Sequence, residues 1–172
     1  MIDGGFSETP GKRFWRIQGG NRMIALACDH GGFDLKEAAI EVLKELGLEY
    51  KDFGTNDRKS VDYPVYGARA ARAVAGGECD RGIILCGTGV GIGITANKVP
   101  GIRCVTCSDT YSARMSRLHN NANMIALGSR VLGTELAKDI LRIWLTTDFS
   151  DEQRHRERVE LIARVERGED IE

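Results

Sequence analysis

The chain has 172 residues, with 24 Lys and Arg against 25 Asp and Glu, so its net charge is −1. This length suits one domain with a single sizeable core and makes a second full domain improbable. The balanced charge gives no general attraction to nucleic acid or to a membrane surface, so we expect neither as a partner. Any anionic ligand must instead meet a local cluster of positive charge.

The first 22 residues are rich in glycine and charge and show no clear period. We interpret residues 1–22 as a flexible leader and residues 23–172 as a single α/β domain. No apolar run approaches the roughly 18 residues that a membrane span needs, and the leader lacks the apolar region of a signal peptide. Five cysteines, an odd number, suit reduced thiols better than a disulfide framework. We therefore predict a cytoplasmic protein.

Short apolar runs alternate with longer amphipathic ones from Met23 onward. The pattern predicts helices that alternate with strands and two further helices that close the chain. The predicted strands span residues 23–28, 48–54, 81–87, 101–108 and 123–129. The predicted helices span residues 33–47, 65–77 (after Pro64), a stretch that begins within the glycine run 87–93, then 110–121, 133–147 and 151–168.

Five strands separated by helices predict a parallel sheet covered on both faces, because a parallel connection needs a crossover that is usually helical. The expected fold class is a doubly wound, three-layer α/β sandwich. Ligands of such folds gather at the carboxyl ends of the strands, where the strand order reverses. That edge is therefore the place to search for a site.

Polar and reactive residues do follow the predicted strands. The first strand ends at Asp29 and His30, the third at Cys86, and the fifth is followed by Arg130. Each residue alone has a structural explanation: Asp29 could cap the next helix, and Ser108 or Asp109 is expected to cap its own. Their convergence on one edge favours a functional site.

The sequence CGTGVGIG begins at Cys86 and does not match the common phosphate loops. A Walker A motif needs Gly-Lys-Ser or Gly-Lys-Thr, and a dinucleotide fingerprint counted from Gly87 needs glycine at position 92, where the chain has Ile92. What remains is a glycine-lined turn whose backbone N–H groups face a ligand at a helix start. A thiol there has its thiolate favoured, so Cys86 could act as a base. The alternative is a small residue that lets a strand turn tightly.

Three histidines occur, at positions 30, 119 and 155. Arg154 and Arg158 are four residues apart, so on a helix they share a face and could bind one phosphate between them. A solvated basic stripe is the alternative, because Arg156 and several glutamates lie in the same segment. Cys104 and Cys107 form a C-x-x-C on a predicted strand, where they point to opposite faces. We interpret them as buried structural thiols, with no metal site.

Several stretches, in this order and spacing, resemble the type B ribose-5-phosphate isomerases, the family that also contains galactose-6-phosphate isomerase subunits. The resemblance covers residues 23 to about 166. Its stretches are ALACDHGGFDLK, DYP, AGGECDRGIILCGTGVGI, ANKVPGIRC, SARMSRLHNNANMIALGSRVLG and RHRERVE. The resemblance implies a Rossmann-like or flavodoxin-like doubly wound domain that forms a homodimer, often paired into tetramers, with the C-terminal helices at the dimer interface and active sites shared between subunits. It implies interconversion of ribose 5-phosphate and ribulose 5-phosphate without a metal or an organic cofactor.

The resemblance also implies a role for individual residues. Cys86 corresponds to the base that moves a proton between C1 and C2, and His119 to the group that supplies the proton for opening the sugar ring. The enediolate loop, with Thr88 counted among the catalytic residues, would consist of Gly87, Thr88, Gly89, Val90 and Gly91. The remaining substrate contacts would come from Asp29, His30, Asn120, Arg130, Arg154 and Arg158.

Two other functions remain open from the sequence. One keeps the chemistry and changes the sugar, to a six-carbon phosphate such as allose or galactose 6-phosphate or to an unphosphorylated sugar, since pocket size decides that choice. The other is a non-catalytic phosphate-binding module. Against it stands the joint presence of Cys86, Thr88 and His119, which anion binding alone would not need.

Overall fold

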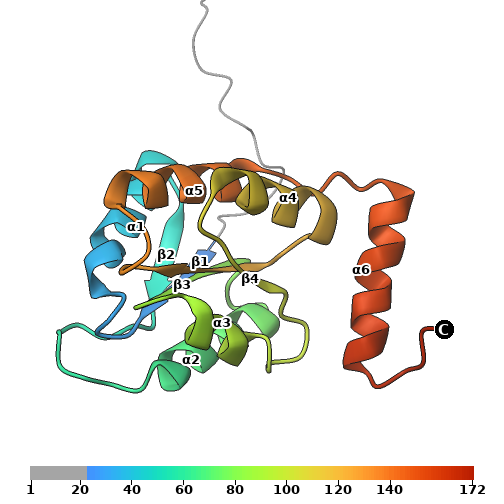
Figure 1. Cartoon of the computed structure of the whole chain (residues 1–172), viewed down its shortest axis with the longest axis horizontal. Coiled ribbons are helices and arrows are strands. Elements are labelled where there is room, and N and C mark those ends of the chain that lie inside the picture. The colour runs from blue at the N-terminus through green and yellow to red at the C-terminus, as the bar shows by residue number, and fades with distance from the viewer. Residues whose placement is uncertain (1–22) are drawn as a thin grey trace, which may run out of the picture.

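The computed structural model describes residues 23–172, so the predicted leader 1–22 lies outside the described residues. The described part contains a five-stranded sheet and six helices (Figure 1). The strands are β1 (Met23–Cys28), β2 (Glu49–Asp52), β3 (Arg81–Cys86), β4 (Cys104–Thr106) and β5 (Met124–Gly128). The helices are α1 (Phe33–Glu45), α2 (Tyr63–Ala75), α3 (Val90–Ala96), α4 (Thr110–Asn120), α5 (Thr134–Thr146) and α6 (Gln153–Glu166).

All strand pairs are parallel, and the order across the sheet is β2-β1-β3-β5-β4. Helices α1, α4 and α5 cover one face, and α2 and α3 cover the other (Figure 1). The predicted doubly wound, three-layer sandwich is therefore confirmed. The chain moves outward from β1 to β2 and then returns to the other side of β1 as β3. The strand order thus reverses beside β1, where such folds place their ligands.

Several predicted boundaries differ from the structure by one to three residues, among them those of β4 and α2. Strand β4 has three residues rather than the eight predicted. It is an edge strand that pairs only with β5, and the Asn97 side chain bonds the N–H and the carbonyl of its first residue, Cys104, at 2.7 and 2.8 Å. Helix α2 begins at Tyr63, one residue before Pro64 rather than after it. Proline fits the first turn of a helix because its missing N–H has no partner there.

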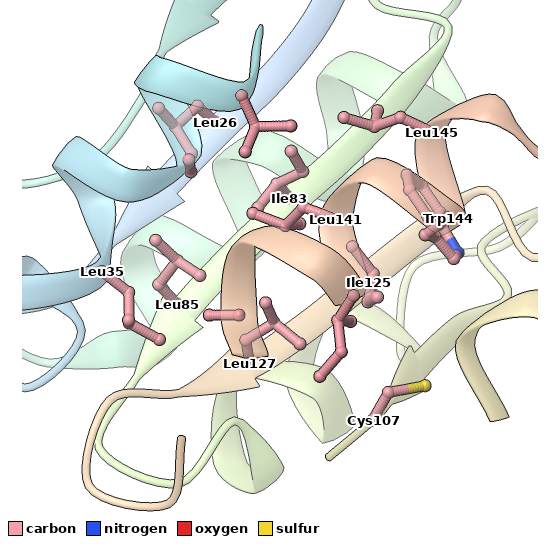
Figure 2. Packing of buried hydrophobic residues seen from close by; sticks show 14 of the residues in the cluster. Leu26, Leu35, Ile83, Leu85, Cys107, Ile125, Leu127, Leu141, Trp144 and Leu145 are labelled. Carbon is pink, nitrogen blue, oxygen red and sulfur yellow. The ribbon is translucent and has the colours of Figure 1, made fainter. Parts of the chain in front are cut away.

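The two sheet faces carry side chains of different size, since alternate residues of a strand point to opposite faces. On the α1/α5 face, large side chains from β1, β3 and β5 meet Leu141 and Trp144 of α5, as Figure 2 shows. On the α2/α3 face the core is built mainly from alanines, together with Ile84 and Ile92. Cys107 packs in the first core and Cys104 against the second, which confirms that these two thiols take opposite faces; Cys104 is only half-buried.

Helix α6 differs from the other helices. It stands beside the α/β body with its axis across the layers (Figure 1); it packs against α4, and its Glu166 accepts a hydrogen bond from the Gly101 N–H at 2.8 Å. Leu161, Ile162 and Val165 on this helix are exposed. Among residues 23–172, no helix is long and apolar enough to cross a membrane.

Candidate active site

Three neighbouring strands bring their carboxyl ends together at one point of the sheet edge. The register pairs Cys28 with Leu85 and Cys86 with Gly128, so the loops after β1, β3 and β5 lie side by side. The Asp29 N–H donates to the Leu85 carbonyl at 3.1 Å, and the Ser129 N–H donates to the Cys86 carbonyl at 3.0 Å. The sheet thus continues its hydrogen bonding into the loops that carry the candidate site.

Glycines allow these loops to pack backbone against backbone. A Cβ on Gly32 would lie 2.3 Å from the carbonyl of Leu85, and a Cβ on Gly128 would lie 2.4 Å from the carbonyl carbon of Thr88. Gly89 has φ 78°, in the left-handed region that favours glycine. The backbone of Thr88 is therefore held against Gly128, where any residue larger than glycine would clash.

Cys86 ends β3 and is 5% exposed. Its Sγ accepts a hydrogen bond from the Gly89 N–H at 3.1 Å. A backbone N–H directed at sulfur stabilises negative charge there, as a nucleophile or base requires. Among the other thiols, burial raises the pKa of Cys28 and Cys107 to about 11 and that of Cys104 to about 12, and it also raises the pKa of Cys79.

Asp29 and His30 occupy the loop after β1. The Asp29 carboxylate is buried and accepts a hydrogen bond from the Gly32 N–H at 2.8 Å, so it ties the turn before α1. The expectation that Asp29 caps this helix is wrong, because the N-cap residue is Gly32 and no side chain caps α1. The His30 Nδ1 accepts a hydrogen bond from the Val61 N–H at 3.1 Å. Because Nδ1 is the acceptor, the neutral ring carries its proton on Nε2, which leaves Nε2–H as a donor.

These loops surround a cleft of about 410 Å³. Eight of the residues predicted from the sequence line it: Asp29, His30, Cys86, Gly87, Thr88, Val90, Gly91 and Arg130. We call these residues, with Gly89, the strand-edge group. The cleft lining joins an acid, two basic side chains, a thiol and backbone N–H groups, which is a suitable set for moving protons on a small polar substrate.

Two further lining residues, Gly31 and Tyr63, were missed. A Cβ on Gly91 would lie 2.6 Å from the Tyr63 ring, so the ring rests directly on the glycine loop. The sequence did contain a signal for Tyr63, because DYP is among the stretches that carry the resemblance. It gave no indication that the start of α2 reaches the cleft.

The other predicted residues lie elsewhere. His119 and Asn120 end α4, while Arg154 and Arg158 share the first turns of α6, and none of the four lines the cleft. We call them the helix-end group. The His119 ring contacts that of His155, with centroids 4.3 Å apart, and Arg154 Nε lies 2.9 Å from a Glu152 carboxylate oxygen. Within one chain the predicted site is therefore divided into two groups.

A metal site is a separate question. Across residues 23–172, no group of three or more His, Cys, Asp or Glu side chains is placed to hold a metal ion. Asp109, which the sequence suggested as a helix cap, does cap α4, since its carboxylate accepts a hydrogen bond from the Ser112 N–H at 2.7 Å.

Comparison with known proteins relates this geometry to a family. The sequence profile described as Ribose/Galactose Isomerase matches residues 24–162. The chain belongs to this family. A member with 52% identity over 145 residues, 84% of this chain and 97% of that protein, is ribose-5-phosphate isomerase B of Escherichia coli (strain K12).

Two more relatives show how close the match is and how varied the family's substrates are. The structure of Clostridium thermocellum ribose-5-phosphate isomerase B superimposes with a TM-score of 0.82 and 52% identity, covering 85% of this chain and 98% of that chain. A D-erythrulose-4-phosphate isomerase of Pectobacterium atrosepticum is 45% identical over 127 residues, 73% of this chain and 84% of that protein. Both groups of candidate residues fall within the range that the Ribose/Galactose Isomerase profile matches.

Proposed function

We propose that this member of the Ribose/Galactose Isomerase family interconverts D-ribose 5-phosphate and D-ribulose 5-phosphate. The observation that carries the proposal is the Cys86 sulfur at the wall of the cleft, with the Gly89 N–H bonded to it. Relatives at 52% identity, named ribose-5-phosphate isomerase B, support the substrate. The chain is thus an aldose–ketose isomerase, and we place it in the cytoplasm.

The chemistry requires a base near carbon and donors near oxygen. In the open-chain aldose, Cys86 as thiolate takes the C2 proton, and the electron pair moves through C1 onto O1 to give an enediolate. Backbone N–H groups of the glycine loop 87–91 stabilise the oxygen charge. The thiol then returns the proton to C1, while a proton moves from O2 to O1, which completes the ketose. Side chains and the backbone supply every step, so the proposed mechanism uses no metal and no organic cofactor.

Binding the phosphate and opening the sugar ring require further side chains, which the helix-end group can supply. Arg130 and His30 are the basic side chains that line the cleft, and a phosphate dianion is bound best by several cations. We propose a homodimer, or a tetramer built from such dimers, in which the helix-end group of one copy enters the cleft of the other. Arg154 and Arg158 then bind phosphate, Asn120 contacts the sugar, and His119 gives a proton to the ring oxygen.

The surface of the chain supports this arrangement. Helix α6 stands away from the body (Figure 1), and its Leu161, Ile162 and Val165 are exposed among residues 23–172. On α3, beside the cleft, Val90 and Ile94 are also exposed. Burying such side chains between two copies contributes about 25 cal/mol for each Å² of apolar surface removed from water.

A six-carbon sugar phosphate is the second candidate substrate, because the profile that matches the chain is named for ribose and galactose isomerases together. The cleft and the division of residues are the same for either substrate. What distinguishes them is the distance between the reacting carbons and the phosphate, which is one carbon longer in the hexose. Comparing kcat/KM for ribose 5-phosphate with that for allose and galactose 6-phosphates separates the two candidates.

Proton exchange tests the proposal directly. Ribose 5-phosphate is incubated with the protein in heavy water and followed by NMR, with Cys86→Ser as the control. We expect ribulose 5-phosphate to form with deuterium entering the sugar, and we expect the variant to exchange none. Exchange confined to hexose phosphates would transfer the activity to the second candidate. Binding without exchange of any sugar would mean a phosphate-binding module and would refute the proposal.

A further inference from the structure

One member of the helix-end group, His119, contacts a histidine that has no role in the proposed mechanism. His155, in the first turn of α6, is 2% exposed, and its ring centroid lies 4.3 Å from that of His119, with the planes inclined by 38°. Rings at this distance are in van der Waals contact, so each restricts the rotamers that the other can adopt. The orientation of the half-buried His119 ring therefore depends on how His155 is held.

A single serine holds His155 and connects it back to α4. The Ser150 hydroxyl lies 2.7 Å from Nδ1 of His155, and the Ser150 N–H donates to the Leu118 carbonyl at 3.1 Å. Leu118 directly precedes His119. These contacts link Leu118 through Ser150 and His155 to His119. They therefore connect the end of α4 to the start of α6.

Burial and nearby charges disfavour protonation of the His155 ring. Its pKa is lowered, first because burial removes the ring from water and then because His119, Arg154 and Arg158 are positive neighbours; Glu152 acts in the opposite direction. Two adjacent imidazolium rings would repel each other. The protonated form of His155 is therefore disfavoured, which suits a positioning role better than a proton-donating one.

We propose that His155, held by Ser150, is a positioning residue that fixes the imidazole of His119 for opening the sugar ring. The proposal rests on the proposed function and extends it to two residues that touch no substrate. In ring opening the C1–O4 bond breaks, O4 takes a proton from His119, and the C1 hydroxyl gives up its proton to solvent. The donor must lie along a lone pair of O4, so a rotated His119 slows this step and leaves the transfer at Cys86 intact.

The two substrates separate these steps. Ribose 5-phosphate closes into a furanose and must be opened. In ribulose 5-phosphate the phosphate blocks the C5 hydroxyl, the one that could close a five-membered ring onto the C2 ketone, so this sugar is already open. The experiment measures kcat with ribose 5-phosphate and the rate of deuterium entry at C1 of ribulose 5-phosphate in heavy water. The variants are Ser150→Ala, with Ser150→Thr as the matched control that keeps the hydroxyl.

Losing one orienting hydrogen bond is expected to lower kcat with ribose 5-phosphate about five- to tenfold in Ser150→Ala, with deuterium entry into ribulose 5-phosphate changed less than about twofold. Ser150→Thr should match the wild type in both. His155→Phe, which keeps a buried ring but loses the hydrogen bond, should behave like Ser150→Ala, and it provides the test if the alanine variant does not fold.

Two outcomes would overturn the proposal: an equal fall in both rates, or an unchanged ribose rate in the folded variants, as judged by circular dichroism. Failure of the proposed function looks different, because the wild type would then exchange deuterium into neither sugar. The positioning role and the isomerase activity can therefore fail separately.

Discussion

The strand-edge group and the helix-end group are held in place by different means. Backbone packing fixes the first: the loops after β1, β3 and β5 touch through glycines that leave no room for a Cβ. Side chains fix the second. Arg103 donates to the carbonyls of Asn120 and Asn121, and Arg117 reaches the carbonyl of Thr147 at 3.2 Å, in addition to the contact of His155 with His119.

The difference shows how the work is divided along one chain. The strand-edge group offers a cleft, a thiol and N–H donors, with Arg130 and His30 as its basic side chains. The helix-end group offers cations and an imidazole, but these lie at the end of α4 and on α6, which stands beside the body, and none lines the cleft (Figure 1). The helix-end group lacks a thiol and a cleft, and it would add two arginines and an imidazole to the basic side chains of the strand-edge group. Two copies placed with the helix ends in the clefts would make two complete sites.

The largest effect should come from the cleft thiol. In Cys86→Ser the hydroxyl stays protonated near neutral pH and cannot replace a thiolate base, so kcat should fall about a thousandfold or more. Cys104→Ser is the matched control, because burial raises the pKa of that thiol to about 12 and its role is structural. Steady-state assays of both variants decide the point, and a Cys86→Ser enzyme with more than a tenth of wild-type turnover would remove Cys86 from the mechanism.

Substituting a glycine by alanine tests whether backbone packing holds the strand-edge group in place. In Gly128→Ala the new Cβ meets the Thr88 backbone, so the glycine loop must move; we expect a loss of about 1–3 kcal/mol of stability and a fall in kcat of about tenfold or more. Gly133→Ala is the control, since a Cβ there meets no atom within 4 Å. Urea unfolding and kinetics measure both effects. Equal behaviour of the two alanine variants would contradict the packing argument.

The helix-end group should act on binding. If Arg154 binds the phosphate as proposed, Arg154→Ala should raise KM about tenfold or more while kcat changes little. Arg156→Ala is the matched control, because Arg156 lies on the same helix and is paired with Asp151 much as Arg154 is paired with Glu152; this variant should leave KM unchanged. If KM is the same in both variants, Arg154 does not bind the phosphate, and the assignment of α6 to the partner's cleft loses its support.

The smallest effect concerns pH. Because the folded pKa of His155 is lowered below its ordinary 6.5, the unfolded chain binds the proton more readily. The contribution of His155 to stability is therefore present above pH 6.5 and is lost as the pH falls through the folded pKa. Urea midpoints should decline between pH 7.5 and pH 5, and less steeply in His155→Phe. Identical slopes for the two proteins would show that His155 titrates no differently on folding.

Much of the strand-edge group could be predicted from the sequence, because apolar runs locate the strands and the residues that follow parallel strands must share an edge. Asp29, His30, Cys86 and Arg130 are of this kind. Tyr63 could not be placed this way. It begins a helix, and its approach to the glycine loop depends on the packing of Gly91 against its ring.

The helix-end group was less predictable for a physical reason. Helical spacing correctly put Arg154 and Arg158 on one helix, but no local pattern indicates where a helix beyond the last strand will stand. Nor does the sequence show that Ser150 links Leu118 to His155. These hydrogen bonds depend on the conformation of the linker between α5 and α6, which is set by tertiary contacts. What the sequence could not supply was the separation of the two groups within one chain.

Mixing two inactive variants tests the shared site most directly. Cys86→Ala and His119→Ala are purified separately, unfolded and refolded together in equal amounts. If each site takes Cys86 from one copy and His119 from the other, half of the dimers are mixed and each mixed dimer has one intact site, so activity should return to about a quarter of the wild-type value. A mixture no more active than its two parents would contradict a site built from two chains.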